Sequence, residues 1–438
     1  MQSKTVSQNC HENITTLFRL GGEFMAKRIG VLTAGGDVPG QNVCLKALVY
    51  LAGDSGFDVV GFRKGWEGLI KYDLGNRTTQ TDNVIALSKS RVRDIDRMGG
   101  SFLHSSRIDP RQVPEKMVPN FLREDRQGQQ PYDLTSHIQT VFAQMQLEAL
   151  VVLGDNGGLE AAAHLCNQGV PIIGIPKSAN NDVNGSHYCL GFSTAMARGV
   201  EFVHEVRAMA GSREEIAIIE VLGRTSGWIT MLISILSGAD RCIIPEVPFD
   251  PDRLAALLAE DKRRNPSNYA ILTMSQGARV TAGQAVKYAP ALSRAAQSSL
   301  LTQVTATKAQ ELGESEDSYS LTDVTELGTD VSGSGAAVTE ILETILDQRT
   351  IFQPLSYLIR TGKPDGQDLL GAVNFATLAV SLLKEKKLCR LAAYRRGDNY
   401  VDLPMDTVNH PETGIPVADL LDMDNYVPKP EVMWAARI

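Results

Sequence analysis

Cysteine is scarce in this 438-residue sequence, and its spacing argues against a structural zinc site. The six cysteines are scattered and form no Cys-x-x-Cys pair, the close spacing that structural zinc sites use. They are Cys10, Cys44, Cys166, Cys189, Cys242 and Cys389. In a chain of this size such cysteines indicate reduced and mostly buried thiols, so we expect a cytoplasmic protein.

Excess positive charge and long apolar runs are lacking as well. The formal net charge is -8 and the pI is near 5.5, which argues against nucleic acid or an anionic membrane as the main partner. No apolar run approaches the roughly 20 residues that span a bilayer, and the N-terminus has no apolar core of a signal peptide. A hydrophobic content of 43% and a charged content of 21% are typical of a soluble globular protein with two or three domains.

Short apolar runs that end in glycine or polar residues alternate with helical patterns along the chain. The expected strands are 29–33, 59–62, 147–153, 170–173, 215–221, 241–246 and 270–274, with 391–394 as a last strand. The expected helices are 43–51, 159–167, 191–209, 229–236, 333–346 and 368–384. This alternation predicts an α/β protein with parallel strands and helices on both faces of each sheet.

Two stretches at the ends of expected strands carry candidate phosphate chemistry. Gly35 and Gly36 lie in a glycine-rich turn between a strand and a helix, where free backbone N–H groups make an anion cradle. A tight turn without a ligand is the alternative at that position. The stretch 174–182, Gly-Ile-Pro-Lys-Ser-Ala-Asn-Asn-Asp, follows an apolar run and places a lysine, amides and a carboxylate at the sheet edge, where ligands bind in such folds.

Five separately placed motifs, taken in order, resemble the phosphofructokinase family, and especially its pyrophosphate-dependent branch. They are Leu-Thr-Ala-Gly-Gly-Asp-Val-Pro-Gly-Gln-Asn at 32–42, Gly-Gly-Ser-Phe-Leu-His-Ser-Ser-Arg at 99–107, Gly-Ile-Pro-Lys-Ser-Ala-Asn-Asn-Asp-Val at 174–183, Glu-Val-Leu-Gly-Arg at 220–224 and Ile-Pro-Glu at 244–246. The resemblance implies two Rossmann-like doubly wound domains, with a phosphoryl donor on the first and fructose 6-phosphate at the cleft.

We also expect a division into domains. Residues 1–24 are polar and irregular, which indicates a loose N-terminal extension or a start codon placed too early. The resemblance gives a larger donor domain formed by 25–191 and about 360–410. A smaller sugar-phosphate domain at 192–359 and a C-terminal tail at 411–438 complete the chain. The family forms dimers or tetramers, so a homodimer or homotetramer is expected, with an active paralogue as an alternative partner.

The resemblance also assigns roles to individual residues. The donor site comprises Gly35, Gly36, Arg107, Asp155, Asn156 and Gly157, and the sugar-phosphate site comprises Leu222, Gly223, Arg224, Glu246, Tyr357 and Arg360. The catalytic positions are Lys177, which contacts phosphate, Asp182, Arg107, which bridges donor and acceptor, and Asn180 at the position of the family's general base. Asp155 is the candidate ligand for Mg²⁺.

The departures from the family pattern fall on the reactive surface. Asn180 replaces the aspartate that acts as general base, and Asn156 replaces a carboxylate that orders magnesium. Ser193 replaces an aspartate, Glu215 an arginine donated across a subunit interface, and Tyr357 a histidine on the sugar phosphate. Loss of a positioned base costs typically about 10² to 10⁴ in rate, and metal and cation placement contributes more to phosphoryl transfer.

Three hypotheses follow. The first is a phosphofructokinase-like protein with little or no kinase activity that binds a phosphate ligand or acts as a structural or regulatory subunit. The second is an active 6-phosphofructokinase that forms fructose 1,6-bisphosphate, in which Asp155, Asp182 or water replaces the missing groups. The third is a different phosphotransfer or binding activity on a related sugar phosphate. Lys177 favours pyrophosphate as donor, whereas Gly157 leaves room for ATP, so the donor stays open.

Overall fold

The computed structural model describes residues 27–123, 131–281, 284, 287–288, 318–320, 334–397, 399–410 and 417–429. The expected N-terminal extension, 1–24, lies outside these residues. The chain divides into two compact units. Unit 1 comprises Met1–Lys177, Val183–Tyr188 and Leu369–His410, and unit 2 comprises Ser178–Asp182, Cys189–Asp368 and Pro411–Ile438. The stretch 174–182 therefore passes from unit 1 into unit 2 directly after Lys177.

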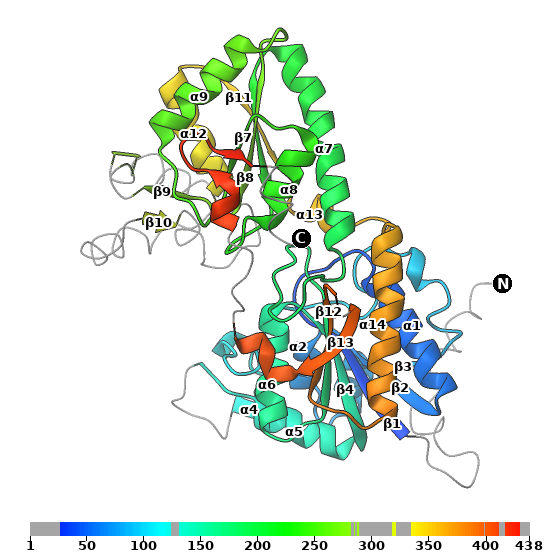
Figure 1. The fold of residues 1–438 in the computed structure, drawn as a ribbon. Helices are drawn as coiled ribbons and strands as arrows, with labels where there is room; N and C mark the ends of the chain where they lie inside the picture. Colours follow the sequence, from blue (N-terminus) through cyan, green and yellow to red (C-terminus); the bar gives the residue numbers. More distant parts are fainter. Residues whose placement is uncertain are drawn as a thin grey trace, which may run out of the picture. The chain divides into compact units, whose positions relative to one another are not determined.

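Unit 1 is built on a sheet of seven strands, in the order β13-β12-β5-β4-β1-β2-β3 (Figure 1). The strands are β1 (Lys27–Thr33), β2 (Phe57–Phe62), β3 (Val84–Leu87), β4 (Leu147–Gly154), β5 (Ile172–Pro176), β12 (Arg390–Arg395) and β13 (Asn399–Pro404). The five inner strands run parallel, and β3 and β13 are antiparallel edges. Central strands read as continuous apolar runs because both faces are covered, as in β4, where Glu148 alone is exposed.

The helices of unit 1 follow the strands as the alternating pattern predicts. They are α1 (Gln41–Asp54), α2 (Trp66–Ile70), α3 (Arg77–Asn83), α4 (Asn120–Arg123), α5 (Thr135–Gln144), α6 (Asn156–Asn167) and α14 (Gly366–Lys384), with short 3₁₀ turns at Ile95–Arg97, Glu115–Met117 and Met405–Asn409. Helix α6 begins directly after β4, so its first turn lies at the carboxyl edge of the sheet.

Two expectations for unit 1 are wrong. The strand at 391–394 is not the last one, because the chain turns back into β13 and further short strands follow in unit 2. Strand β3 was not expected at all. Both missed strands pair antiparallel at an edge of the sheet, where pairing depends on the neighbouring strand more than on a buried apolar pattern.

Unit 2 contains a parallel sheet of four strands in the order β11-β6-β8-β7. They are β6 (Ile216–Val221), β7 (Arg241–Ile243), β8 (Ala270–Ser275) and β11 (Thr350–Pro354), and a hairpin pairs β9 (Arg279–Thr281) with β10 (Ser318–Ser320). The helices are α7 (Phe192–Arg213), α8 (Trp228–Ser237), α9 (Pro251–Arg264), α12 (Ser334–Leu346) and α13 (Ser356–Arg360). Strand β7 is three residues shorter at its end than expected, and most of the expected loops and helices between 275 and 330 lie outside the described residues.

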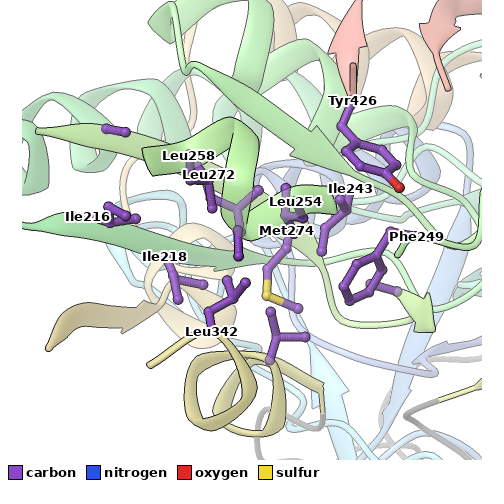
Figure 2. Packing of buried hydrophobic residues seen from close by; sticks show 14 of the residues in the cluster. Ile216, Ile218, Ile243, Phe249, Leu254, Leu258, Leu272, Met274, Leu342 and Tyr426 are labelled. Atoms are coloured by element: carbon purple, nitrogen blue, oxygen red, sulfur yellow. The ribbon is translucent and has the colours of Figure 1, made fainter. Parts of the chain in front are cut away.

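One apolar core joins β6 and β8 of unit 2 to helices α9 and α12 (Figure 2). Ile218, Leu258, Leu272 and Leu342 are fully buried in it. Tyr426 comes from the C-terminal segment and packs into the same cluster, while its hydroxyl accepts the N–H of Asp250 at 2.9 Å. The described part of that segment contains a 3₁₀ turn at Val417–Leu420 and the paired strands β14 (Leu421–Asp422) and β15 (Val427–Pro428).

Helix α14 is the one helix, within the described ranges, that is long and apolar enough to cross a membrane. Half of its apolar stretch is buried against the rest of the protein, with Ala372, Phe375 and Ala376 completely covered. A core helix of a globular domain passes the same test, so this single helix is weak evidence for a membrane span.

Candidate functional site

The glycine-rich turn after β1 has a left-handed backbone at its first glycine. Gly35 has a φ of 81°, in the left-handed region that favours glycine. Its N–H donates to the carbonyl of Ser106 at 3.0 Å, which ties the turn to the loop that ends in Arg107. Arg107 itself is exposed. Helix α1 starts only at Gln41, after Gly40, and no side chain caps it.

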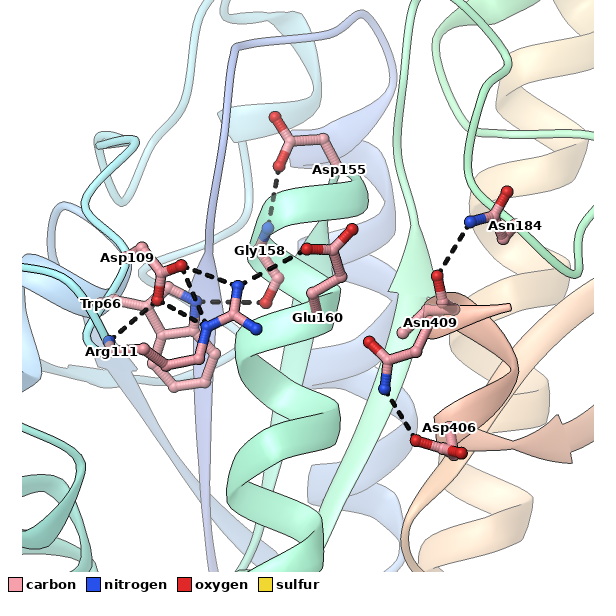
Figure 3. Close-up of polar contacts among 10 residues, drawn as sticks. Trp66, Asp109, Arg111, Asp155, Gly158, Glu160, Asn184, Asp406 and Asn409 are labelled. Atoms are coloured by element: carbon pink, nitrogen blue, oxygen red, sulfur yellow. Dashed lines mark hydrogen bonds and ion pairs between the residues drawn. The ribbon is translucent and has the colours of Figure 1, made fainter. Parts of the chain in front are cut away.

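Asp155 lies against this turn and also begins helix α6. As the N-cap residue it accepts the N–H of Gly158 through Oδ1 at 3.1 Å (Figure 3). Its other oxygen, Oδ2, accepts the N–H of Gly36 at 3.4 Å. A Cβ atom added to Gly35 would overlap the Asp155 carboxyl group, so the two are in direct contact. The structure therefore brings Gly35, Gly36 and Asp155 together, from positions more than a hundred residues apart.

Asn156 and Gly157 occupy the first turn of α6 next to Asp155. The Asn156 side-chain oxygen Oδ1 accepts the N–H of Asn184 at 3.3 Å. Gly157 is exposed, and a Cβ atom there would meet nothing within 4 Å. Trp66 supports the same turn, because its indole Nε1 donates to the carbonyl of Gly158 at 3.2 Å (Figure 3). Asn156 is thus held by the chain rather than turned freely toward solvent.

Lys177 follows β5 and is completely buried. Its ammonium group donates to the carbonyl oxygen of Gly36 at 2.7 Å. A buried ammonium needs such acceptors because desolvation of its charge is costly. Lys177 and Asp155 therefore both form hydrogen bonds with Gly36, Lys177 with its carbonyl and Asp155 with its N–H. These residues of unit 1 form one connected cluster.

Asn180 and Asp182 belong to the segment of unit 2 that follows Lys177. Asn180 donates through Nδ2 to Asp182 Oδ2 at 3.2 Å, and its own Oδ1 is buried without a hydrogen-bond partner. The other Asp182 oxygen accepts the hydroxyl of Ser178 at 2.5 Å. The position of the family's base thus holds an amide that acts as a hydrogen-bond donor to the neighbouring carboxylate. Ser178 was not among the predicted residues, although it lies only four positions from Asp182.

The turn after β6 contains Leu222, Gly223 and Arg224. Gly223 has a φ of 107°, and its carbonyl accepts the N–H of Gly277 at 2.9 Å. Leu222 is fully buried, and its carbonyl accepts the hydroxyl of Thr230 at 2.9 Å. These contacts leave Arg224 exposed at the carboxyl edge of the unit 2 sheet. Gly277 was missed because it lies about fifty positions further along the chain.

Glu246 reaches the N-terminus of helix α8. Its two carboxyl oxygens accept the N–H of Gly227 at 2.9 and 3.0 Å. Burial raises the pKa of Glu246, and the Gly227 hydrogen bond opposes that change. The carboxylate thus lies where the helix dipole favours negative charge.

Tyr357 and Arg360 lie three residues apart on the short helix α13, and so on the same side of it. Tyr357 is 53% exposed, whereas Arg360 is partly buried. Helix α13 is attached to α7, because Arg198 donates through Nε to the carbonyl of Leu358 at 3.1 Å. Of the other departures, Ser193 donates to Asp365 at 2.6 Å and Glu215 pairs with Arg213 at 3.8 Å.

Two buried carboxylates of unit 2 were missed by the sequence analysis. Asp368 is fully buried and accepts the N–H groups of Gly191 at 2.7 Å and Thr194 at 2.9 Å, which caps α7. Glu220 is fully buried and accepts the N–H of Gly335 at 2.7 Å; burial raises the pKa of Glu220 to about 7. Their partners lie more than a hundred residues away, so no local pattern marks either role.

The residues near Asp155 do not fit a magnesium ion held by the protein. Mg²⁺ prefers carboxylate ligands in octahedral geometry. Asp155 supplies one carboxylate, whose two oxygens also accept backbone N–H groups, and its neighbour Asn156 is an amide in place of a second carboxylate. Throughout the part of the chain that the structure describes, no three His, Cys, Asp or Glu side chains gather into a metal-binding group.

Comparison with known proteins gives consistent matches. A family model described as Phosphofructokinase matches residues 28–383. The chain is 34% identical over 257 residues to ATP-dependent 6-phosphofructokinase 3 of Streptomyces coelicolor, covering 58% of this chain and 67% of that protein. It is 32% identical over 259 residues to an ATP-dependent 6-phosphofructokinase of Streptococcus pyogenes, covering 59% and 68%.

Solved structures show the same fold. The pyrophosphate-dependent phosphofructokinase from Marinobacter aquaeolei superimposes with a TM-score of 0.66 at 15% identity, covering 92% of this chain and 89% of that one. The phosphofructokinase from Saccharomyces cerevisiae gives a TM-score of 0.60 at 21% identity, covering 91% and 47%. At these identities the likeness concerns the fold alone, and it confirms the predicted pair of α/β domains of the phosphofructokinase type.

Proposed function

Because this chain belongs to the phosphofructokinase family, we propose that it binds a sugar phosphate, a phosphoryl donor or both, with kinase activity that is impaired or absent. The carrying observation is the amide of Asn180, which donates a hydrogen bond to Asp182. A sugar hydroxyl must lose its proton when it attacks a phosphoryl group, and an amide does not accept that proton. A missing general base lowers the rate by about 10² to 10⁴.

We propose that the phosphoryl donor binds to unit 1 and the sugar phosphate binds to unit 2. We assign the donor position to the turn at Gly35 and Gly36 in unit 1, which Asp155 and Lys177 contact. We assign sugar-phosphate contacts to Arg224, Glu246, Tyr357 and Arg360 in unit 2, with Leu222 and Gly223 shaping the turn. The two arginines supply the cationic groups that a phosphate dianion requires. Arg107 is the remaining cation proposed for the donor side, and Gly157 leaves its first helical turn uncrowded.

An active 6-phosphofructokinase is the second candidate, and Asp182 is the observation that favours it. This carboxylate lies two residues from the base position and contacts the Asn180 side chain. Relatives of this chain are named ATP-dependent 6-phosphofructokinases, and a structural neighbour is named pyrophosphate-dependent. In this alternative, Asp182 accepts the proton, with pyrophosphate or ATP as donor.

We extend the proposal to assembly and location. The family resemblance supports a homodimer or homotetramer, or assembly with an active paralogue, in the cytoplasm. Mg²⁺ enters this proposal only as a companion of the phosphoryl donor, since the protein side chains do not fit a resident ion.

A coupled assay for fructose 1,6-bisphosphate tests the proposed function. With fructose 6-phosphate, Mg²⁺ and either pyrophosphate or ATP, we expect turnover well below about 1 s⁻¹, the low end of ordinary enzymes. Calorimetric titration with fructose 6-phosphate is expected to show binding. Turnover at or above that level contradicts impaired activity, and Asp182→Asn then shows whether Asp182 has become the base.

A further inference from the structure

Helix N-termini and glycine-rich turns bind phosphate through free backbone N–H groups. In this protein two such features face each other in unit 1: the turn at Gly35 and Gly36, and the first turn of α6. A phosphoryl donor requires that their N–H groups be available.

The Asp155 carboxylate accepts one hydrogen bond from each feature. Oδ1 accepts the N–H of Gly158 in α6, and Oδ2 accepts the N–H of Gly36 in the turn. Gly35 has no side chain, and the carboxyl group fills the space beside its Cα. A phosphate oxygen in that space would overlap the carboxylate and face a like charge.

This arrangement exceeds an ordinary helix cap. Asp250, the N-cap of α9, accepts two N–H groups of its own helix through Oδ1 and the side-chain N–H of Gln284 through Oδ2 at 3.0 Å. Asp155 instead joins its helix to a turn 119 positions earlier in the chain. In that same turn, the carbonyl oxygen of Gly36 accepts a hydrogen bond from the buried ammonium group of Lys177. The turn that contacts the Asp155 carboxylate therefore also contacts a cation.

We propose that Asp155 is a built-in anion that occupies the phosphoryl-donor cradle and determines that this protein takes a sugar phosphate in preference to a phosphoryl donor. The proposal rests on the proposed function and specifies it, because exclusion of the donor is a second obstacle to catalysis besides Asn180. Asp155 acts here as a specificity-determining residue that touches the donor position directly.

Pyrophosphate binding measured by calorimetry, without sugar phosphate and without metal, tests this role. Asp155→Ser keeps a capping oxygen, removes the charge and opens space. It is expected to bind pyrophosphate at least about tenfold more tightly than the unchanged protein, as when one hydrogen bond to a charged group is regained. Asp155→Asn, which keeps the size of the side chain, is expected to change affinity in the same direction by less.

Asp250→Ser is the matched control, since it removes an N-cap carboxylate in unit 2 and is expected to leave pyrophosphate affinity unchanged. Equal affinity in the unchanged protein and in both Asp155 variants overturns the proposal. Weaker pyrophosphate binding by the Asp155 variants, measured without Mg²⁺ or in a second titration with Mg²⁺, also overturns the proposal, because Asp155 would then hold the donor. The proposed function is tested separately, by turnover and by fructose 6-phosphate binding. Neither measurement affects the comparison of pyrophosphate affinities between the variants and the unchanged protein.

Discussion

Asn156→Asp and Asn180→Asp, introduced together into the Asp155→Ser protein, are expected to raise the rate of fructose 1,6-bisphosphate formation by about 10²- to 10⁴-fold over Asp155→Ser alone. The serine opens the donor cradle. The Asn180→Asp change supplies a carboxylate that accepts the hydroxyl proton, and the Asn156→Asp change supplies the negative oxygen missing from the first turn of α6. The measurement is the coupled assay with Mg²⁺ and with pyrophosphate and ATP in parallel.

The surrounding contacts are compatible with both substitutions. Asn156 uses its side-chain oxygen as an acceptor for the Asn184 N–H, and a carboxylate serves that bond equally well. The Asn180→Asp change removes the donor bond to Asp182, and two neighbouring carboxylates raise the pKa of one of them. Activity gained in this way is therefore expected to increase with pH until the second carboxyl group has ionised.

Asn181→Asp in the same background is the matched control for charge. Asn181 lies between Asn180 and Asp182, and its side-chain oxygen accepts the Cys189 N–H at 2.6 Å, so a carboxylate there keeps that bond. It is expected to give no gain in rate. If the variant with Asn156→Asp and Asn180→Asp also shows no increase in rate, the scaffold no longer aligns donor and acceptor. That result would favour a binding or regulatory role.

Gly277→Ala is expected to weaken fructose 6-phosphate binding by at least about tenfold and to destabilise unit 2 by about 1–3 kcal/mol. An added Cβ would overlap the carbonyl oxygen of Arg224, so the backbone of the 222–224 turn must move. That movement also strains the 2.9 Å hydrogen bond from the Gly277 N–H to the Gly223 carbonyl. Calorimetry gives the affinity and urea unfolding gives the stability.

Gly211→Ala on α7 is the control for a glycine-to-alanine change in the same unit. Its Cβ would lie 3.5 and 3.6 Å from Tyr269, which is ordinary contact, and alanine in a helix stabilises by roughly 0.5–1 kcal/mol. Sugar-phosphate affinity should not change there. If Gly277→Ala lowers stability but leaves affinity intact, the 222–224 turn does not contact the sugar phosphate.

Local sequence determined the strands and helices that carry both sites. The apolar runs of β1, β4 and β6 are buried on both faces, and such continuous runs are visible without a structure. The replacement of a carboxylate by Asn180 is equally local, as is its neighbour Asp182. Fold class and family followed from these short-range patterns because each depends on residues that are close in the chain.

Tertiary structure alone decided what those residues contact. Asp155 meets Gly36, Asn156 meets Asn184, and Asp368 caps α7 from 174 positions away. The edge strands β3 and β13 likewise depend on pairing with a neighbour. A hydrogen bond between distant segments leaves no periodic trace in the sequence, because it depends on how strands are ordered in the sheet. For that reason Asp155 reads as a candidate metal ligand in the sequence and as the occupant of an anion cradle in the folded chain.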